Sequence, residues 1–398
     1  MEDVGEERRL QAIMESGEAS MARMTRLAVM GIAIAALGTG IAFPSLGQVA
    51  TQAQFPWQQY EGLTSLEIPY ANGPISAEHV PQVWLKLRGA EPRWFGMDTG
   101  STGIVTSAAH FVPGAGDVAQ GPGRLVYNSS GRVLNGERYL TDVTIQRDAH
   151  TPLATARVQV LRVTHITCLE HARDCRPEQN PRRVGFMGIG FDRGGAQGTA
   201  AETAPRNPFV NLVSLATGQP ASNVRPGYVI TRTAVHLGMT PALARHMAFL
   251  KLAPKASPSG EPDWAGTPME VVVDGRRGHG TLLMDTGIDY MFLSPPPGTA
   301  LRRGHVAPEG TRLAIYLPDR RQPQPAFYDL VVGRRGNPLH PAKVEVVHDA
   351  GVFVNTGRMF LQGFDYLYDA AGGYVGFGWN GRVSPDYGGV TPGLSAAR

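Results

Sequence analysis

The amino-acid sequence predicts an all-β fold built from two similar halves. Its 398 residues include 49 glycines and 31 prolines spread along the chain, a composition that suits short strands joined by tight turns. Short runs of alternating or β-branched residues, bounded by Gly, Pro or Asp, occur almost throughout. The tripeptide Asp-Thr-Gly occurs at residues 98–100 and again 187 residues further on, at 285–287. This spacing is about half the chain and indicates an internal repeat.

Five segments carry the clearest strand pattern. They are residues 81–89, 156–166, 227–238, 269–275 and 311–317. Only residues 208–216 and 241–251 have an apolar spacing that suits helices. Residues 253–264 and 293–304 are rich in Pro, Ser and Gly, and we expect them to be surface loops.

Both copies of Asp-Thr-Gly follow an apolar run. Residues 94–97 lead into Asp98, and residues 282–284 lead into Asp285, so each acid comes at the end of a predicted buried strand. An Asx-turn, in which the Asp side chain caps nearby backbone N–H groups, would explain one copy. With ordinary residue usage the tripeptide should occur about 0.1 times in a chain of this length. A second copy at half-chain spacing therefore needs another explanation.

Two carboxylates brought together by pseudo-symmetry provide that explanation. If the two halves meet at these turns, Asp98 and Asp285 lie a few ångströms apart, share one proton and titrate as a pair. One carboxylate can then take a proton from water while the other gives a proton to a carbonyl group. Gly100 and Gly287 would allow the backbones to approach closely, and Ser101 could donate a hydrogen bond to Asp98.

These segments resemble the pepsin-like, two-lobed aspartic peptidases over most of residues 80–380. MDTGSTGIVTS is similar to the first active-site strand and turn of that family, and TLLMDTGIDYMFLS is similar to the second. VGFMGIGF resembles the apolar strand that supports the first turn. VITRTAVHLGM resembles the interlobe strand and turn, and NTGRMFLQGFDYLYDAAGGYVGFG resembles the C-terminal closing segment.

The resemblance implies two pseudo-symmetric β-barrel-like lobes, residues 54–222 and 223–385, with an active-site cleft between them and a tail at 386–398. It implies that Asp98 and Asp285 activate a water molecule to hydrolyse a peptide bond, with no metal, no cofactor and no covalent intermediate. The active-site turns beside an extended polypeptide substrate would be formed by Thr99, Gly100, Ser101, Thr286 and Gly287. Since one chain supplies both acids, we expect a monomer.

Three departures from the family pattern stand out. Ile288 occupies a position where the family usually has Thr or Ser, so Asp285 is expected to lack the hydrogen bond that Ser101 can give Asp98, which would favour its neutral form. A tryptophan common just after the first turn is absent. In the family, a tyrosine on a hairpin covers the two catalytic acids. The best candidate for this tyrosine is Tyr127, but Tyr127 is equally well explained as an ordinary strand aromatic.

The first 50 residues carry an export pattern. Residues 27–43 contain no charge, follow two arginines and precede small residues, with plausible cleavage points after Gly47 or Ala53. A single membrane anchor is the alternative, although 17 residues with three glycines are at the lower limit for a membrane span. We expect a periplasmic or secreted protein that contacts a membrane only if this segment stays uncleaved, as in a bacterial-type exported family member.

The chain has two cysteines, Cys168 and Cys175. In an oxidising compartment a disulfide that closes this small loop is the simpler interpretation. A zinc site would need two further ligands, which His165 and His171 could supply.

Other functional classes find little support. The formal net charge is +3, but no segment combines clustered Lys and Arg with aromatic residues, so we expect no nucleic-acid partner. The chain lacks a Gly-x-Ser-x-Gly elbow, a His-Glu-x-x-His motif and a phosphate-binding loop. The sequence therefore predicts an exported aspartic endopeptidase. Two alternatives stay open: a catalytically silent pepsin-like module that holds a peptide or glycan in the same cleft, and an envelope assembly protein.

Overall fold

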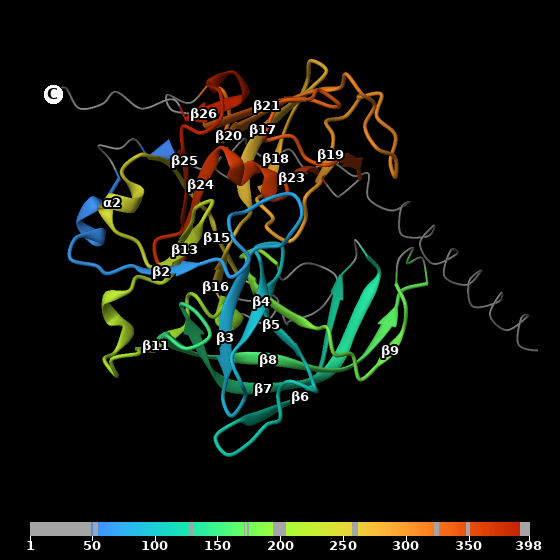
Figure 1. The fold of residues 1–398 in the computed structure, drawn as a ribbon. Helices are drawn as coiled ribbons and strands as arrows, with labels where there is room; N and C mark the ends of the chain where they lie inside the picture. The colour runs from blue at the N-terminus through green and yellow to red at the C-terminus, as the bar shows by residue number, and fades with distance from the viewer. Residues whose placement is uncertain are drawn as a thin grey trace, which may run out of the picture. The chain divides into compact units, whose positions relative to one another are not determined.

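Strands far outnumber helices in the computed structural model, as the sequence predicted (Figure 1). The structure describes residues 49–50, 55–127, 130–170, 172, 175–193, 204–256, 262–321, 326–347 and 351–390. The apolar segment 27–43, the cleavage points after Gly47 and Ala53, the zinc-ligand candidate His171 and most of the tail 386–398 fall outside these ranges. In the described part of the chain no helix is long and apolar enough to cross a membrane.

A nine-stranded sheet forms in the first half of the described chain. Its strands are β3 (Gln82–Leu87), β4 (Arg93–Asp98), β5 (Thr102–Ser107), β6 (Val118–Tyr127), β7 (Arg132–Gln146), β8 (Pro152–Cys168), β9 (Glu178–Gln179), β10 (Gly185–Ile189) and β11 (Leu212–Leu215). The order is β11-β8-β5-β10-β4-β3-β7-β6, with β9 beside β8. Because β7 also pairs with β8 along nearly its whole length, strands β8, β5, β10, β4, β3 and β7 close into a barrel (Figure 1).

An eight-stranded sheet forms in the second half of the described chain. Its strands are β17 (Thr267–Val273), β18 (Arg276–Leu283), β19 (Met291–Ser294), β20 (Arg312–Leu317), β21 (Ala326–Val331), β22 (Val344–Val346), β23 (Val352–Asn355) and β26 (Gly388–Val390). Their order is β22-β19-β23-β18-β17-β20-β21-β26. Residues 388–390, which belong to the predicted tail, thus add an edge strand to this sheet.

A seven-stranded sheet combines segments from both halves. Its strands, in spatial order, are β1 (Val49–Ala50), β14 (Met247–Lys251), β25 (Tyr374–Trp379), β24 (Phe364–Asp369), β12 (Gly227–Ile230), β13 (Ala234–Leu237) and β2 (Leu66–Pro69). A separate hairpin consists of β15 (Pro254–Ala256) and β16 (Pro262–Trp264). The short helices are η1 (Trp57–Tyr60), η2 (Ala204–Arg206), η3 (Ala221–Asn223), α2 (Pro241–Ala244), η4 (Arg358–Gln362) and η5 (Pro385–Tyr387). The predicted boundary at residues 222 and 223 falls within η3, just before β12.

The same three-strand arrangement occurs around each Asp-Thr-Gly. In the first half, β10 runs parallel to β4, which ends at Asp98, and antiparallel to β5, which follows the turn. In the second half, β23 runs parallel to β18, which leads to Asp285, and antiparallel to β19, which follows that turn. In each half, the strand before the Asp-Thr-Gly turn and the strand after it are therefore held together by a third strand between them, β10 or β23.

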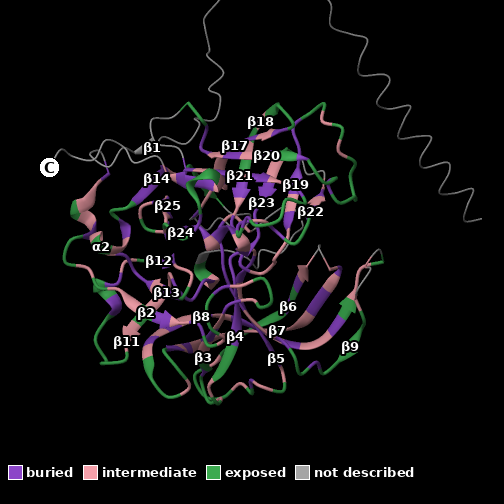
Figure 2. Cartoon of the chain, turned by 45° about the horizontal axis from the view of Figure 1, so that its top comes forward, coloured by how far each residue is buried: buried purple, intermediate pink, exposed green. Residues whose placement is uncertain are grey.

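Alternation along the strands places the apolar side chains inside, where Figure 2 shows the purple, buried positions. In β3, for example, Val83 and Leu85 are fully buried, whereas the intervening Trp84 is only half-buried. Along β4, Phe95 and Met97 point into the same core, so Trp94, Gly96 and Asp98 face the other side of the strand. This outer face of β4 carries the first catalytic candidate.

The five predicted strand segments are confirmed, but the helix predictions are wrong. Residues 208–216 contain β11, and of residues 241–251 only Pro241–Ala244 is helical, before β14 begins at Met247. Strand β14 pairs with β25 on one side and β1 on the other, so backbone pairing within the sheet outweighs the local helical spacing. The expected loop at 253–264 instead contains the β15–β16 hairpin.

Candidate active site

The two Asp-Thr-Gly turns interlock through their threonines. The backbone N–H of Thr99 donates to Thr286 Oγ1 at 3.0 Å, and the N–H of Thr286 donates to Thr99 Oγ1 at 2.9 Å. Each hydroxyl in turn donates to a backbone carbonyl of the opposite strand, Thr99 to Met284 at 2.5 Å and Thr286 to Met97 at 2.7 Å. Both threonines are buried. This two-fold set of four hydrogen bonds fixes the two turns against each other.

The interlock brings the two predicted carboxylates face to face. A Cβ placed on Gly100 would lie 2.6 Å from Asp285 Oδ2, and a Cβ on Gly287 would lie 2.6 Å from Asp98 Oδ1. These distances are too short for any side chain, so each turn needs glycine opposite the other carboxylate. Asp98 is only 6% exposed and Asp285 only 7% exposed. The sequence prediction that Gly100 and Gly287 allow close approach agrees with this geometry.

Each carboxylate also accepts two hydrogen bonds from its own half. Asp98 accepts from the Gly100 N–H at 2.7 Å and from the Ser101 hydroxyl at 2.5 Å, as the sequence suggested. Asp285 accepts from the Gly287 N–H at 2.8 Å. Its second donor is an amide, because Asn355 Nδ2 donates to Asp285 Oδ2 at 2.7 Å.

The hydrogen bond from Asn355 corrects one sequence-based expectation. Ile288 was expected to leave Asp285 without the donor that Ser101 gives Asp98, but the buried Asn355 at the end of β23 supplies it. Asn355 is itself held in place, since its Oδ1 accepts the Gly357 N–H at 3.0 Å. A signal was present in the sequence: the polar Asn355 ends an apolar strand and precedes Thr-Gly, and a buried amide needs hydrogen-bond partners.

The surroundings of the pair favour a bound proton. Burial, followed by the negative charge of Asp285, raises the pKa of Asp98 to about 7, although hydrogen bonds from Ser101 and Gly100 act in the opposite direction. A hydrogen bond between the two carboxyl groups also favours the protonated form of Asp98. Burial and the neighbouring charge therefore favour a proton on Asp98 in mildly acidic solution.

Replacement of Asp98 by asparagine should change how stability depends on pH. The pKa of Asp98 is raised in the folded state, so the folded protein holds a proton that the unfolded chain has already released between about pH 4 and pH 7. The free energy of unfolding of the wild type should therefore fall over this range by roughly 2–4 kcal/mol relative to Asp98→Asn, and the difference should stay constant above it. Urea denaturation at a series of pH values measures this.

An exposed aspartate provides the control for this titration. Hydrogen bonds from the backbone N–H of His150 and from Thr151 lower the pKa of Asp148, so its carboxyl is ionised in both the folded and the unfolded state above about pH 5, and wild type and Asp148→Asn should give parallel stability curves from there to pH 8. Parallel stability curves for wild type and Asp98→Asn from pH 4 to pH 8 would contradict a proton held by the pair.

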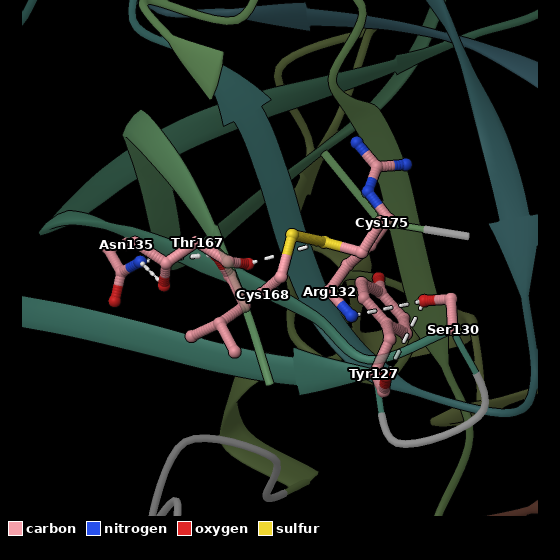
Figure 3. Close-up of a disulfide and its surroundings, with 8 residues drawn as sticks. Tyr127, Ser130, Arg132, Asn135, Thr167, Cys168 and Cys175 are labelled. Atoms are coloured by element: carbon pink, nitrogen blue, oxygen red, sulfur yellow. Dashed lines mark hydrogen bonds between the residues drawn. A yellow bond between two sulfur atoms is a disulfide. The ribbon is translucent and has the colours of Figure 1, made fainter. Parts of the chain in front are cut away.

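Tyr127 lies at the end of β6, beside the turn of the β6–β7 hairpin (Figure 3). Its ring is half-buried, and its centroid is 6.5 Å from that of Phe186, which is on β10 two residues before Gly188. Gly188 is the register partner of Asp98. Tyr127 thus belongs to a hairpin that packs on the strand beside the first carboxylate, and its role over the pair stays a prediction.

The predicted disulfide is confirmed, since Cys168 and Cys175 are bonded in the structure (Figure 3). Their sulfurs are therefore not free thiolates for zinc. The loop that they close packs on the β6–β7 turn, because the Leu169 N–H donates to the Gly131 carbonyl at 2.8 Å. The disulfide thus supports the hairpin that carries Tyr127.

Metal ligands and known relatives give no further assignment. Among the residues that the structure describes, no group of three or more His, Cys, Asp or Glu side chains is arranged to hold a metal ion. No protein-family model matches this chain, and no curated protein is significantly similar to it in sequence. The two interlocked carboxylates are accordingly the strongest indication of what the protein does.

Proposed function

We propose that this protein is an aspartic endopeptidase in which Asp98 and Asp285 act as one catalytic unit. The observation that carries the proposal is the pair of buried carboxylates, held face to face by four hydrogen bonds between Thr99, Thr286 and the opposite strands. A purely structural role gives little reason to keep two acids in contact, because each carboxylate then opposes ionisation of the other.

The reaction follows from one proton shared by two acids. With a water molecule between the carboxylates, Asp285 accepts a proton from the water while Asp98 donates its proton to the carbonyl oxygen of the peptide. The water oxygen bonds to the carbonyl carbon and gives a tetrahedral diol. A proton then passes from a diol hydroxyl to the amide nitrogen through the pair, the C–N bond breaks, and the carboxyl and amine products leave. The raised pKa of Asp98 suits the acid role at mildly acidic pH.

The strand arrangement supports a pepsin-like, two-lobed fold. The closed barrel around Asp98 and the eight-stranded sheet around Asp285 would be the two lobes, and the seven-stranded sheet that draws on both halves would join them. The repeated strand–turn–strand unit with a third strand beside it is the expected result of an internal duplication. In this fold, an extended polypeptide would lie across the pair. We further propose that the chain is exported as a monomer.

Digestion of a denatured protein mixture tests the proposal. The purified full-length protein is incubated with the mixture across about pH 3 to pH 8, and new termini are identified by mass spectrometry. We expect internal cleavages that are strongest in the acidic half of this range, where Asp98 holds its proton. No new termini at any pH, together with peptide binding, would favour the silent binding module instead.

The amide of Asn355 should support the carboxylate that accepts the proton from water. Asn355→Leu keeps the volume but removes the hydrogen bond that Asn355 Nδ2 donates to Asp285 Oδ2. We expect kcat/KM to fall about tenfold, which corresponds to the loss of one charge-assisted hydrogen bond at the reacting pair. Steady-state kinetics on one cleaved peptide measure the loss.

A second-site variant separates this effect from a loss of packing. Ile288 holds the position that corresponds to Ser101 of the first turn, three residues after the acid. Adding Ile288→Thr to Asn355→Leu should restore a donor and recover part of the lost kcat/KM. A kcat/KM that is unchanged in Asn355→Leu would show that this amide has no part in catalysis.

A further inference from the structure

A cavity of about 540 Å³ opens on the first barrel, beside the strands that lead to Asp98. Gly96 of β4 and Phe186 of β10 line it, together with Val80 and Trp94. In the parallel register of these two strands Phe186 pairs with Gly96 and Gly188 pairs with Asp98. The cavity and the carboxylate therefore lie along the same two strands, two residues apart.

The cavity and Asp98 also lie on the same face of β4. Side chains two residues apart on a strand point to the same side, and the intervening Met97 points into the barrel core. Trp94, which is 53% exposed, continues this outer face beyond Gly96. A Cβ on Gly96 would lie 3.1 Å from the Phe186 ring, so glycine at this position lets that ring pack directly against β4. At ~3.3 Å per residue, Gly96 is ~7 Å from the position of Asp98 and Arg93 is ~17 Å away.

The charges that line the cavity are predominantly positive. Arg93, Arg182 and Arg183 line it along with His79 and His110, and Glu78 is the acid among the lining residues. Within the described ranges of the chain, none of the three arginines forms an ion pair with a carboxylate. We name the cavity formed by these residues with Gly96 and Phe186 the basic cavity.

Hydrogen bonds from the second half of the chain hold one wall of the basic cavity in place. Arg358 and Gln362 of η4 donate to backbone carbonyls of the segment that leads to Glu78 and His79. The guanidinium of Arg358 reaches Ser76 at 2.8 Å and Ala77 at 2.5 Å, and Gln362 reaches Ile75 at 2.7 Å. Since η4 begins three residues after Asn355, the wall is fixed relative to the second carboxylate as well.

We propose that the basic cavity is a specificity subsite that binds an acidic side chain of the polypeptide substrate. The proposal rests on the proposed endopeptidase function and names the substrate class. A peptide extended along the outer face of β4 rises ~3.3 Å per residue, so the acidic residue would be about two to five residues from the cleaved bond. Its methylene groups would contact Phe186 and Trp94, and its carboxylate would pair with the arginines.

Cleavage of a random peptide library by the full-length protein tests the subsite. The cleaved peptides are aligned on the broken bond, and the frequency of Glu is compared with that of Gln at each position. We expect Glu to be about tenfold enriched over Gln at one position about two to five residues from the bond on one side. The enrichment should fall as salt is raised. Equal frequencies of Glu and Gln at all positions would overturn the proposal.

A matched pair of variants assigns the enrichment to the cavity. Arg182→Gln/Arg183→Gln should bring the ratio of Glu to Gln close to one. Arg302→Gln/Arg303→Gln changes a tandem exposed arginine pair in the second half of the chain and should keep the wild-type ratio. Loss of the Glu preference in both variants, or in neither, would contradict the assignment.

If no peptide is cleaved, that result counts against the endopeptidase function alone. A binding measurement then still tests the subsite. Fluorescein-labelled octapeptides with Glu or with Gln at every second position are titrated with the Asp98→Asn protein, and anisotropy gives the dissociation constants. We expect the Glu peptide to bind about tenfold more tightly, and Arg182→Gln/Arg183→Gln to remove the difference. Equal affinities for both peptides would reject the subsite.

Discussion

Replacement of either Asp98 or Asp285 by asparagine is expected to lower kcat for peptide hydrolysis by about four orders of magnitude. Asparagine has the shape of aspartate but can neither hold the shared proton nor accept one from water. The hydrogen bonds from Gly100 and Gly287 to the side-chain oxygens can persist in these variants, so the fold should survive. Steady-state kinetics on one cleaved peptide, together with circular dichroism, checks both statements.

The double variant provides the stronger test of joint action. Since the two acids would share one proton and one water, Asp98→Asn/Asp285→Asn should be little slower than either single variant. Asp263 serves as the control, because it is also buried but accepts its hydrogen bonds from the backbone of Asp192 and Trp264. Asp263→Asn should keep the wild-type kcat. Peptidase activity that survives either replacement in the pair would refute the catalytic assignment.

Replacement of Thr286 by valine is expected to destabilise the protein by about 2–5 kcal/mol. Valine has nearly the same shape as threonine but lacks the hydroxyl, so two buried groups lose their partners: the Thr99 N–H loses its acceptor and the Met97 carbonyl loses its donor. Each unsatisfied buried group costs about 1–3 kcal/mol. Urea denaturation measures the difference in the free energy of unfolding.

Thr286→Ser is the matched variant for this prediction. Serine keeps the hydroxyl and both hydrogen bonds, and loses only a methyl group, so it should retain most of the wild-type stability. If Thr286→Val were as stable as Thr286→Ser, the interlock between the turns would contribute little to the fold.

The strands could be predicted because their sequence periodicity and their environment agree. Residues 81–89 and 311–317 alternate between apolar and polar side chains, and both form strands with one face in the core, β3 and β20. Residues 241–251 show the limit of such patterns. Their spacing fits a helix, but β25 offers a complete row of backbone partners to Met247–Lys251, which only the folded sheet provides.

The candidate site was predictable where a motif repeats and unpredictable where the symmetry is broken. Asp98 and Asp285 follow from the duplicated tripeptide, and Ser101 follows from its place in the first turn, three residues after the acid. Asn355 is 70 residues from Asp285 in the sequence, and only the parallel pairing of β23 with β18 brings it to that carboxylate. The second turn thus uses a distant amide where the first uses a local hydroxyl.

The pH dependence of kcat/KM above neutrality tests the shared proton most directly. In the proposed mechanism Asp98 must carry a proton, and its pKa is raised to about 7 by burial and by the charge of Asp285. We predict that kcat/KM for one cleaved peptide falls about tenfold per pH unit above this value, as expected for the loss of one essential proton. A kcat/KM that stays constant or rises between about pH 7 and pH 9 would contradict catalysis by this pair.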